Sequence, residues 1–504
     1  MGGTVSDRFS RQRGLLRQDV VSQLLVSMRF NECPAPFVVA MKILGEQLGA
    51  PEIADMISPK TEDGYQVVWV PTAKREAKTN CLPVSYGEKG IFLDGSSAGD
   101  RVEPVYEPAI ATVAACLIWS EILRRSDAYQ PIEIPKVSVS VNVRVNENSL
   151  RNYVPDLQFS LDGHTVHQNV REANDGTTHK RVLLRLDDND PVVQDLIKRL
   201  NVQHPNHEVE HRAPTLSLSL PRLNSELSGH LSIVGAGGLG TWCLHTLVEG
   251  LKQADGTNVQ FLVFDKDLEI EEHNLNRQVI YGPEDVGLTK IAATRRWLEQ
   301  RLPNARVKVV YELTDAMAHP SEDASEDGIN LDDLFDSEPD TNQLHDDTLT
   351  VQQTVEELAS TDMILGCLDA MRPRVLANCI AAMQGVPYIN GGVAALEGAY
   401  HQFTSDSLIE MYGPRAARDT TVMSCQEDGV VPLSSIVLTN AFVGAFQALA
   451  ALQRLSGYSS SCIQSAYLNA YENEVQVQQG AAHPIQSASV EALSEALWSE
   501  GAVA

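Results

Sequence analysis

One segment near the middle of the chain restricts the possible folds more than any other feature of the sequence. Residues 231–234 form a short apolar run that is typical of a buried strand, and the glycine-rich turn 235–240 (GAGGLG) follows directly. Residues 241–251 then have a helical pattern, and residues 259–264 form a second apolar run. A strand, a glycine turn, a helix and a strand in this order predict a βαβ unit, so we expect an α/β fold with a mostly parallel sheet.

The glycines of this turn suit a site for an anion. Gly235 permits a tight turn, Gly237 lets the backbone approach a phosphate, and Gly240 allows the helix to pack closely on the strand. The N-terminus of the helix adds N–H groups and a positive dipole. Asp265 follows the second strand, where its carboxylate could accept hydrogen bonds from a ribose. These features fit NAD as well as ATP, and a purely structural turn is the alternative without a ligand.

Two basic residues downstream favour ATP over NAD. Arg277 lies in the motif Asn-Leu-Asn-Arg-Gln of residues 274–278, and Lys290 follows Gly287-Leu-Thr. Two fixed cations beside a nucleotide suit the charge that builds up on phosphoryl oxygens during displacement, although each alone could be an ordinary surface residue. Asp369, at the end of a later strand, could hold Mg²⁺ together with phosphate oxygens, or it could simply cap a helix.

Charge and hydropathy exclude several classes of protein. The chain has 39 Lys and Arg against 67 Asp and Glu, a net charge of −28, which argues against a nucleic-acid partner. No run approaches the roughly eighteen apolar residues that a membrane-spanning helix needs, so we expect no membrane partner. The first thirty residues contain several charges and no apolar signal-peptide core. The sequence therefore predicts a soluble, cytoplasmic protein.

The cysteines predict neither a zinc site nor a disulfide framework. The chain has 8 cysteines, and no two of them form a CxxC pair. Zinc ribbons need such pairs, and disulfide frameworks belong to secreted proteins. We therefore expect no zinc, and most of the cysteines to be buried thiols.

A long acidic segment interrupts the second half of the chain. Residues 309–371 contain no Lys or Arg, and residues 315–347 hold twelve Asp and Glu. Such a segment cannot bury itself, so we expect an acidic insert at 314–349 that lies in solvent. A docking strip for a basic partner is the alternative.

Taken together, these motifs resemble the ThiF/MoeB/ubiquitin-activating superfamily. The resemblance rests on five motifs in the family's order and spacing, across about residues 225–460: the glycine turn, Asp265-x-Asp267, the motif at 274–278, Gly287-x-x-Lys290, and Cys-Leu-Asp369 followed by Arg374. It implies a Rossmann-like adenylation domain that uses ATP and Mg²⁺ to adenylate the C-terminal carboxylate of a ubiquitin-like protein.

The same resemblance implies a role for each matching residue. Asp265 would hold the ribose, Arg277 and Lys290 the phosphates, and Asp369 would position Mg²⁺. The remaining residues of the implied nucleotide site are Gly235, Gly237, Gly238, Gly240, Asp267 and Asn274. The sequence departs from the family in two ways. It lacks the two CxxC pairs of many bacterial members, and Ala-Met-Arg follows Asp369 where the family usually has Asn.

The N-terminal region contains two further resemblances. The segment Asp-Arg-Phe-Ser-Arg-Gln at 7–12 is similar to the family's opening segment, whose second Arg, here Arg11, reaches the nucleotide site of the neighbouring unit. Residues 108–125 resemble residues 432–454, since each has a proline, a helix of small apolar residues and a Leu and Arg ending. We therefore predict an intrachain pseudo-dimer in which Arg11 completes the active site. A homodimer, or a cap on a surface helix, is the alternative role for Arg11.

These resemblances predict the division of the chain. Residues 1–228 would be a degenerate, inactive adenylation-like half without a glycine turn, and the alternating residues 137–146 predict a β-rich insertion in it. Residues 229–480 would be the active ATP-binding domain, and residues 481–504 a tail.

Cys425 is the predicted nucleophile. Residues 424–430 resemble the family's C-x-x-x-G-V loop, in which the cysteine takes the activated protein as a thioester. Arg415 and Arg418 are close in sequence and could lower the pKa of the thiol, although a buried structural thiol is the alternative. The predicted function is adenylation followed by thioester formation for a conjugating enzyme. The alternative is a sulfur-carrier or peptide adenylyltransferase without this relay; an NAD-dependent oxidoreductase and a scaffold are less compatible with the phosphate-binding set.

Overall fold

A computed structural model of the chain contains two units, one of residues 1–130 and 213–504 and the other of residues 131–212. Each unit is described separately. The structure describes residues 9, 12, 14–55, 65–69, 81–93, 96, 98–130, 137–145, 155–161, 164–167, 178–185, 215–218, 220, 226–266, 269–314, 317, 349–404, 407–412, 416–417, 436–457, 462–471, 473–480 and 487–498.

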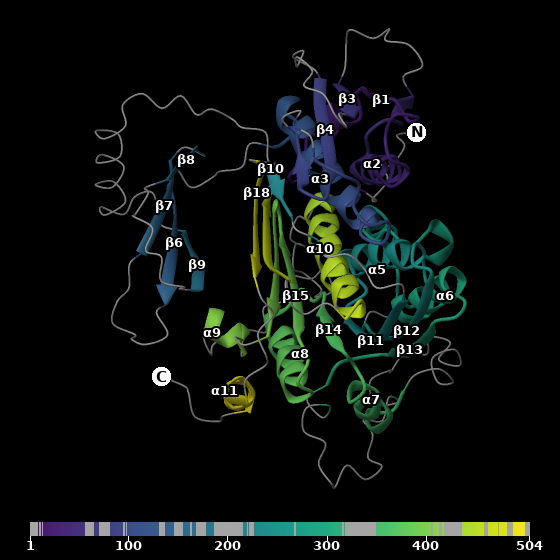
Figure 1. Ribbon diagram of the computed structural model, residues 1–504, viewed down its shortest axis with the longest axis vertical. Helices are drawn as coiled ribbons and strands as arrows, with labels where there is room; N and C mark the ends of the chain where they lie inside the picture. Colours follow the sequence, from purple (N-terminus) through teal and green to yellow (C-terminus); the bar gives the residue numbers. More distant parts are fainter. Residues whose placement is uncertain are drawn as a thin grey trace, which may run out of the picture. The chain divides into compact units, whose positions relative to one another are not determined.

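The second half of the chain forms an eight-stranded sheet in the larger unit (Figure 1), with the order β13-β12-β11-β14-β15-β16-β17-β18. Its parallel strands are β11 (Glu226–Val234), β12 (Gly256–Phe264), β13 (Arg306–Val310), β14 (Met363–Gly366) and β15 (Tyr388–Ala394). The antiparallel strands are β16 (Glu397–Phe403), β17 (Cys462–Asn469) and β18 (Glu474–Gly480). The predicted α/β class with a mostly parallel region around the glycine turn is confirmed.

The order of the parallel strands reverses at β11. The chain runs outward from β11 to β12 and β13, and then returns to the other side of β11 to form β14. The carboxyl ends of β11 and β14 therefore border the switch point of the sheet, where ligands of open α/β folds bind. The two strands end at Val234 and Gly366, which are paired in register.

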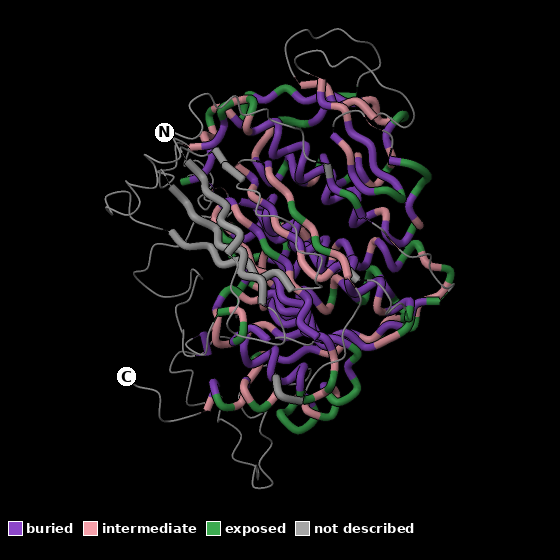
Figure 2. The backbone as a smooth tube through the Cα atoms, turned by 60° about the vertical axis from the view of Figure 1, so that its left-hand side comes forward, coloured by how far each residue is buried: buried purple, intermediate pink, exposed green. Residues whose placement is uncertain are grey.

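Helices cover both faces of this sheet. Alternate residues of β11 enter different cores: Ile233 belongs to the core that contains α5 (Gly238–Leu251), α6 (Lys290–Arg301) and α10 (Val437–Leu455), and Val234 to the opposite one. The opposite core contains residues of α7 (Val351–Leu358), α8 (Met371–Met383), α9 (Leu408–Tyr412) and α11 (Ser487–Trp498). Nearly all of α10 is buried, as the purple segments of Figure 2 indicate for the core as a whole.

The N-terminal part of the same unit forms a second sheet, with the order β10-β5-β4-β3-β1-β2. Its strands are β1 (Val26–Met28), β2 (Ala54–Asp55), β3 (Tyr65–Trp69), β4 (Cys81–Gly87), β5 (Gly90–Phe92) and β10 (Thr215–Ser217). Its helices are α1 (Gln18–Val21), α2 (Ala35–Leu48) and α3 (Glu107–Arg125).

This second sheet has the strand arrangement of the first. The order β2-β1-β3-β4-β5-β10 corresponds to β12-β11-β14-β15-β16-β17, and in both sheets three parallel pairings are followed by two antiparallel ones. The helices correspond as well. α2 and α5 each have 14 residues and follow the equivalent strands β1 and β11. α3 and α10 each have 19 residues and precede the equivalent strands β10 and β17.

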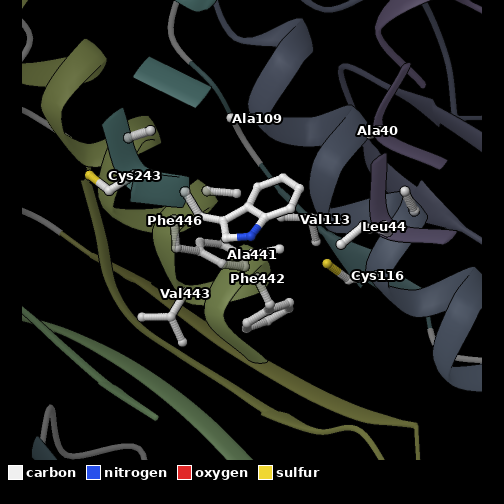
Figure 3. Packing of buried hydrophobic residues seen from close by; sticks show 14 of the residues in the cluster. Ala40, Leu44, Ala109, Val113, Cys116, Cys243, Ala441, Phe442, Val443 and Phe446 are labelled. Carbon is white, nitrogen blue, oxygen red and sulfur yellow. The ribbon is translucent and has the colours of Figure 1, made fainter. Parts of the chain in front are cut away.

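The helices of the two sheets share one core. α3 packs against α10 and against α5, and residues of α2, α3, α5 and α10 form a single cluster of buried side chains (Figure 3). Gly444 on α10 makes a close approach possible, since a Cβ at this position would lie 2.7 Å from the backbone nitrogen of Cys243 on α5. The two sheets therefore face each other across a helical layer, in which most residues of α3 and nearly all residues of α10 are buried.

The smaller unit is a four-stranded antiparallel sheet with the order β8-β7-β6-β9. Its strands are β6 (Val137–Val145), β7 (Pro155–Leu161), β8 (His164–His167) and β9 (Thr178–Arg185). The alternating residues 137–146 were predicted to form a strand, and β6 confirms this. In the chain, the unit lies between α3 and β10.

None of the helices in the described part of the chain combines the length and the hydropathy that crossing a bilayer requires.

Candidate active site

The glycine turn lies at the carboxyl end of β11, beside β14. Gly235 has a φ of 102°, and a Cβ there would lie 2.5 Å from the carbonyl oxygen of Cys367, so no other residue fits without strain. At Gly240 a Cβ would overlap the carbonyl oxygen of Gly235. At Gly237, in contrast, no described residue other than its two neighbours in the chain has a heavy atom within 4 Å of the position that a Cβ would take. Two glycines are therefore needed by the fold, whereas the third faces open space at the N-terminus of α5.

The helix after the turn begins earlier than its sequence pattern predicts. The pattern indicates a helix from residue 241, but α5 begins at Gly238, with Gly237 as its N-cap residue. The carbonyl oxygen of Gly237 accepts a hydrogen bond from the backbone N–H of Thr241 at 2.9 Å. The first N–H groups of α5 consequently belong to the glycine turn itself, and they supply the positive end of the helix dipole there.

Asp265 is joined to the turn by a hydrogen bond. Its Oδ2 atom accepts the backbone N–H of Ala236 at 2.6 Å. Burial raises the pKa of the Asp265 carboxyl, the positive charge of Lys290 and the Ala236 hydrogen bond oppose this rise, and the negative charge of Asp369 adds to it. Lys290 and Asp369 are therefore close enough to Asp265 for their charges to act on its carboxyl.

Arg277 lies against the start of α5. Its guanidinium donates to the carbonyl oxygen of His273 at 2.9 Å and to Oδ1 of Asn276 at 3.1 Å. Its Cγ lies 3.3 Å from the position that a Cβ would take at Gly238. Asn274 has a local contact, since its Oδ1 accepts the backbone N–H of Glu271 at 3.0 Å and caps the 3-10 turn η2 (Glu272–Asn274).

The residues at the switch point fit ATP with Mg²⁺. Asp369 lies three residues after the end of β14. The carbonyl oxygen of Leu368, just before it, accepts a hydrogen bond from Nε of Arg374 at 2.8 Å. Among the described residues, no group of three His, Cys, Asp or Glu could hold a metal ion by itself. Mg²⁺ bound with a nucleotide needs only one or two carboxylates, because phosphate oxygens and water supply the other ligands. The arrangement therefore suits a metal that arrives with the phosphates.

Sequence reasoning missed two polar residues of α10 that support the switch point. Asn440 places Oδ1 2.7 Å from the Cβ position of Gly238, and its Nδ2 donates to the carbonyl oxygen of Ile436 at 2.9 Å. Gln447 donates through Nε2 to the carbonyl oxygens of Gly366 at 2.8 Å and of Ile389 at 3.0 Å. The available signal was that both amides interrupt an otherwise apolar helix.

Tyr281 was also missed. Its hydroxyl contacts the glycine turn, because it lies 3.0 Å from the carbonyl oxygen of Ala236. A tyrosine that follows a turn motif has no distinctive pattern in the sequence, so only the structure identifies it.

Three predicted site residues lie outside the described residues, namely Arg11, Asp267 and Cys425. Arg415, Arg418 and most of the predicted acidic insert lie outside them too. Gln12, next to Arg11 in the chain, is described and buried, and its Nε2 donates to the carbonyl oxygen of Gln47 at 2.8 Å, near the end of α2.

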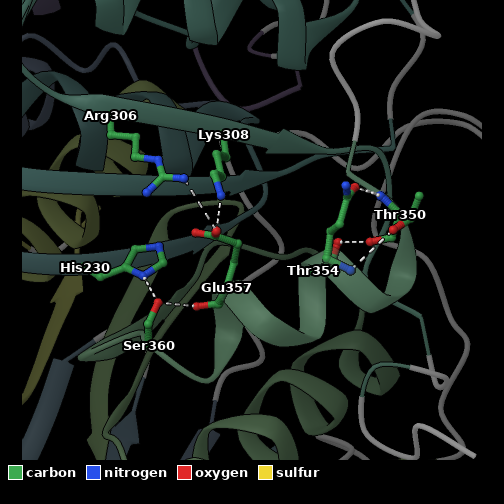
Figure 4. Close-up of polar contacts among 8 residues, drawn as sticks. His230, Arg306, Lys308, Thr350, Thr354, Glu357 and Ser360 are labelled. Carbon is green, nitrogen blue, oxygen red and sulfur yellow. Dashed lines mark hydrogen bonds and ion pairs between the residues drawn. The ribbon is translucent and has the colours of Figure 1, made fainter.

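A separate polar cluster links α7 to the sheet by ion pairs and hydrogen bonds (Figure 4). Glu357 pairs with Lys308 and with Arg306 of β13, and Nδ1 of His230 lies 2.8 Å from Oγ of Ser360. His230 and Arg306 both pair with Gln260, and each lies four residues before the end of its strand. At the rise of a β-strand, this places them about 13 Å from the glycine turn. This cluster therefore supports the fold and is remote from the candidate site.

Comparison with known protein families gives a match over residues 222–488, to the model of the ThiF family. Three curated relatives are similar over this region. The adenylyltransferase and sulfurtransferase UBA4 of Meyerozyma guilliermondii is 24% identical, over 45% of this chain and 43% of its own length. The adenylyltransferase and sulfurtransferase MOCS3 of Aedes aegypti is 25% identical, over 52% of this chain and 50% of its own length. The SAMP-activating enzyme E1 of Haloferax volcanii is 25% identical, over 41% of this chain and 61% of its own length. The chain spans about half the length of the first two relatives.

Two solved structures are also similar. A crystal structure of Escherichia coli MccB with MccA has a TM-score of 0.33 and 16% identity, over 52% of this chain and 66% of that one. A crystal structure of PaaA has a TM-score of 0.32 and 17% identity, over 51% of this chain and 65% of that one.

Proposed function

The chain belongs to the ThiF family, and on this premise we propose that it uses ATP to adenylate the C-terminal carboxylate of a ubiquitin-like protein. One observation supports the proposal above all. The open space at Gly237 adjoins the N-terminus of α5, with Asp265, Arg277 and Lys290 close by. A helix N-terminus together with two cations binds polyphosphate well, and an NAD site has no need of both cations.

In the proposed reaction, an oxygen of the substrate carboxylate attacks the α-phosphorus of ATP. The bond between this phosphorus and the bridging oxygen breaks, pyrophosphate leaves, and an acyl adenylate forms. Arg277 and Lys290 would stabilise the charge on the phosphoryl oxygens, since the guanidinium of Arg277 is held by its hydrogen bond to His273 and Lys290 is buried. Mg²⁺, for which Asp369 is the proposed protein ligand, neutralises phosphate charge when bound.

Asp265 has the proposed task of orienting the nucleoside. Its hydrogen bond to the Ala236 N–H fixes the carboxylate at the end of β12, next to the glycine turn. The nearby charge of Lys290 favours the ionised carboxylate, which accepts hydrogen bonds from ribose hydroxyls. The ribose and the phosphates would consequently be held by two adjacent segments, the end of β12 and the glycine turn.

We propose that the activated protein is then transferred to Cys425 as a thioester and passed to a conjugating enzyme. In this step the thiolate attacks the acyl carbon and AMP leaves. The resemblance of residues 424–430 to the family's cysteine loop supports the step. The second candidate is adenylation of a sulfur carrier without this relay, and the names of the relatives UBA4 and MOCS3, both described as sulfurtransferases, favour it.

We also propose that the N-terminal half is a degenerate copy of the adenylation domain, and that the chain is a pseudo-dimer. Besides the common strand order, one hydrogen bond is common to both halves. The backbone N–H of Phe30, two residues after β1, donates to Oδ1 of Asp55 at the end of β2 at 3.3 Å. In the other half, the N–H of Ala236, two residues after β11, donates similarly to Asp265, which in register lies one residue further along than Asp55 does.

The residues that suit a nucleotide are replaced in this half. The turn between β1 and α2 reads RFNECP and has no glycine. When α3 and α10 are aligned from their first residues, Ile110 and Leu117 occupy the positions of Asn440 and Gln447. In this proposal Arg11 completes the one active nucleotide site of the chain. The half would otherwise serve as a partner for the packing of α10.

One experiment tests the adenylation and the thioester separately. We expect ATP–pyrophosphate exchange in the presence of a cognate ubiquitin-like protein, and a thiol-sensitive adduct between the two proteins. Cys425→Ala should retain exchange and lose the adduct, whereas Cys81→Ala, a partly exposed cysteine of β4, should retain both. Loss of exchange and adduct together would assign Cys425 a structural role. If no carrier protein supports exchange, the proposed function is wrong.

A further inference from the structure

One buried hydroxyl connects three segments of the candidate site. The Oη atom of Tyr281 lies 3.0 Å from the carbonyl oxygen of Ala236 in the glycine turn. It also lies 2.9 Å from Oγ1 of Thr294 and 3.4 Å from the carbonyl oxygen of Lys290, both on α6. The side chain of Tyr281 is buried, so these contacts are shielded from water.

The direction of these hydrogen bonds follows from the number of protons. A phenol has one proton to donate, and a carbonyl oxygen can only accept. The carbonyl oxygen of Ala236 is the nearer of the two carbonyl partners of Tyr281, so the phenol donates to it. The hydroxyl of Thr294 then donates to the phenol oxygen. A chain of donors therefore runs from α6, through Tyr281, to the glycine turn.

Fixing this carbonyl oxygen also fixes the next amide. The peptide bond is planar and trans, so the N–H of Gly237 points opposite to the carbonyl oxygen of Ala236. Tyr281 holds that oxygen toward α6, and the Gly237 N–H is therefore directed away from α6. On its other side, Ala236 is held by the hydrogen bond from its own N–H to Asp265. Both ends of this short segment are thus restrained before any ligand arrives.

The Gly237 amide lies where an anion would bind. Apart from its neighbours in the chain, none of the described residues has a heavy atom within 4 Å of a Cβ position at Gly237, which is the N-cap residue of α5. An N–H group at such a helix end is a donor for phosphate oxygens, and its effect depends on its direction. A donor that is oriented in advance binds more tightly than one that must reorient with the ligand.

We propose that Tyr281 is a positioning residue, whose hydroxyl orients the Ala236–Gly237 peptide so that the Gly237 N–H donates to a phosphate oxygen of the nucleotide. The inference rests on the proposed function, because it takes ATP as the ligand. It assigns the recognition of the anion to a residue that does not touch it. The ring of Tyr281 fills space that a phenylalanine would also fill, so the hydroxyl can be tested alone.

The test compares Tyr281→Phe with Tyr400→Phe by calorimetric titration with ATP and with adenosine, in the full-length protein. Tyr400 is a matched control, because its buried hydroxyl donates to the carbonyl oxygen of Ile463 at 2.8 Å, on the antiparallel strands of the sheet. We expect Tyr281→Phe to raise the Kd for ATP about tenfold, which is less than removal of a preorganised donor would cost. Its Kd for adenosine should stay the same, and Tyr400→Phe should change neither.

A second pair of variants covers the case in which Tyr281→Phe does not fold. Thr294→Val removes the donor to the phenol and should weaken ATP binding in the same direction, whereas Thr294→Ser keeps the hydroxyl and should bind ATP like the wild type. Unchanged ATP binding by Tyr281→Phe, or an equal loss for ATP and adenosine, would overturn the inference alone. If the wild-type protein binds no ATP, the proposed function fails as well.

Discussion

Replacing Gly237 with alanine should separate nucleotide binding from folding. Gly237 has a φ of −79° and a ψ of −157°, an extended conformation that does not require glycine, and in the described part of the chain only its two neighbours have atoms within 4 Å of the position that the new methyl group would take. The fold therefore accepts the methyl group without strain. The methyl group would, however, occupy the open space in front of α5, where we place the phosphates.

The expected magnitudes follow from this geometry. Alanine restricts the unfolded chain, which stabilises the protein by about 0.4–1 kcal/mol, and it is a poorer N-cap residue than glycine by a similar amount. These effects offset each other, so the free energy of unfolding should change by less than about 1 kcal/mol. Loss of one or two hydrogen bonds to a charged phosphate, at about 1.5–3 kcal/mol each, should weaken ATP binding tenfold or more.

Urea denaturation and calorimetric titration with ATP measure the two quantities. Gly256→Ala is the matched control, because its Cβ would make only an ordinary contact, at 3.5 Å from Glu226, and it should preserve both stability and binding. Gly235→Ala is the contrasting variant. Its positive φ and the nearby carbonyl oxygen of Cys367 should make it strongly destabilising. Normal ATP binding by Gly237→Ala, or a loss of more than about 2 kcal/mol in stability, would refute the reasoning.

Three further outcomes are expected. Gln447→Leu removes the donor of two hydrogen bonds to buried carbonyl oxygens, and should lower the free energy of unfolding in urea by about 2–4 kcal/mol. The control is Gln453→Leu, which should be neutral or stabilising, because the side-chain amide of Gln453 has no hydrogen-bond partner among the described residues. Equal losses would contradict this. Burial lowers the pKa of His245 to about 4, so below pH 6.5 the unfolded chain binds a proton that the folded chain does not. The free energy of unfolding should therefore fall by up to about 3 kcal/mol between pH 6.5 and pH 4, and His245→Phe should remove much of this pH dependence. Arg11→Ala should slow ATP–pyrophosphate exchange by about tenfold or more if Arg11 completes the site, and an unchanged rate would contradict that role.

The sequence predicted well the local fold around the candidate site. The apolar runs, the glycine turn and Asp265 are adjacent in the chain, so their pattern defines a βαβ unit without knowledge of the rest. Both strands prove longer than these runs, because residues 226–230 and 256–258, most of which are not apolar, also pair in register. Hydrogen bonding of the backbone extends a strand beyond its buried part, and hydropathy does not report it.

The parts that were missed depend on distant contacts. Tyr281 acts on the glycine turn from a loop 45 residues away, and Gln447 reaches the end of β14 across 81 residues. Nothing in the sequence around Tyr281 distinguishes it from a packing residue. Gln447 interrupts an apolar helix, but the sequence does not show which groups it contacts. From the sequence, the degenerate N-terminal half was predicted only from one helix and the opening segment. Its strand order was not predicted, because β1 and β2 have only 3 and 2 residues and are too short to have a recognisable period.

The contact between α3 and α10 has a consequence for how the protein responds to dilution. Subunits that meet through helices separate as their concentration falls, because association depends on mass action. Here the two helices belong to the same chain, and 18 residues of α10 are buried. The effective concentration of each helix near the other is set by the connecting chain and does not change with the amount of protein. The apolar surface of α10 is therefore covered at every concentration, and a fragment that begins at residue 226 would lose the helix that covers it.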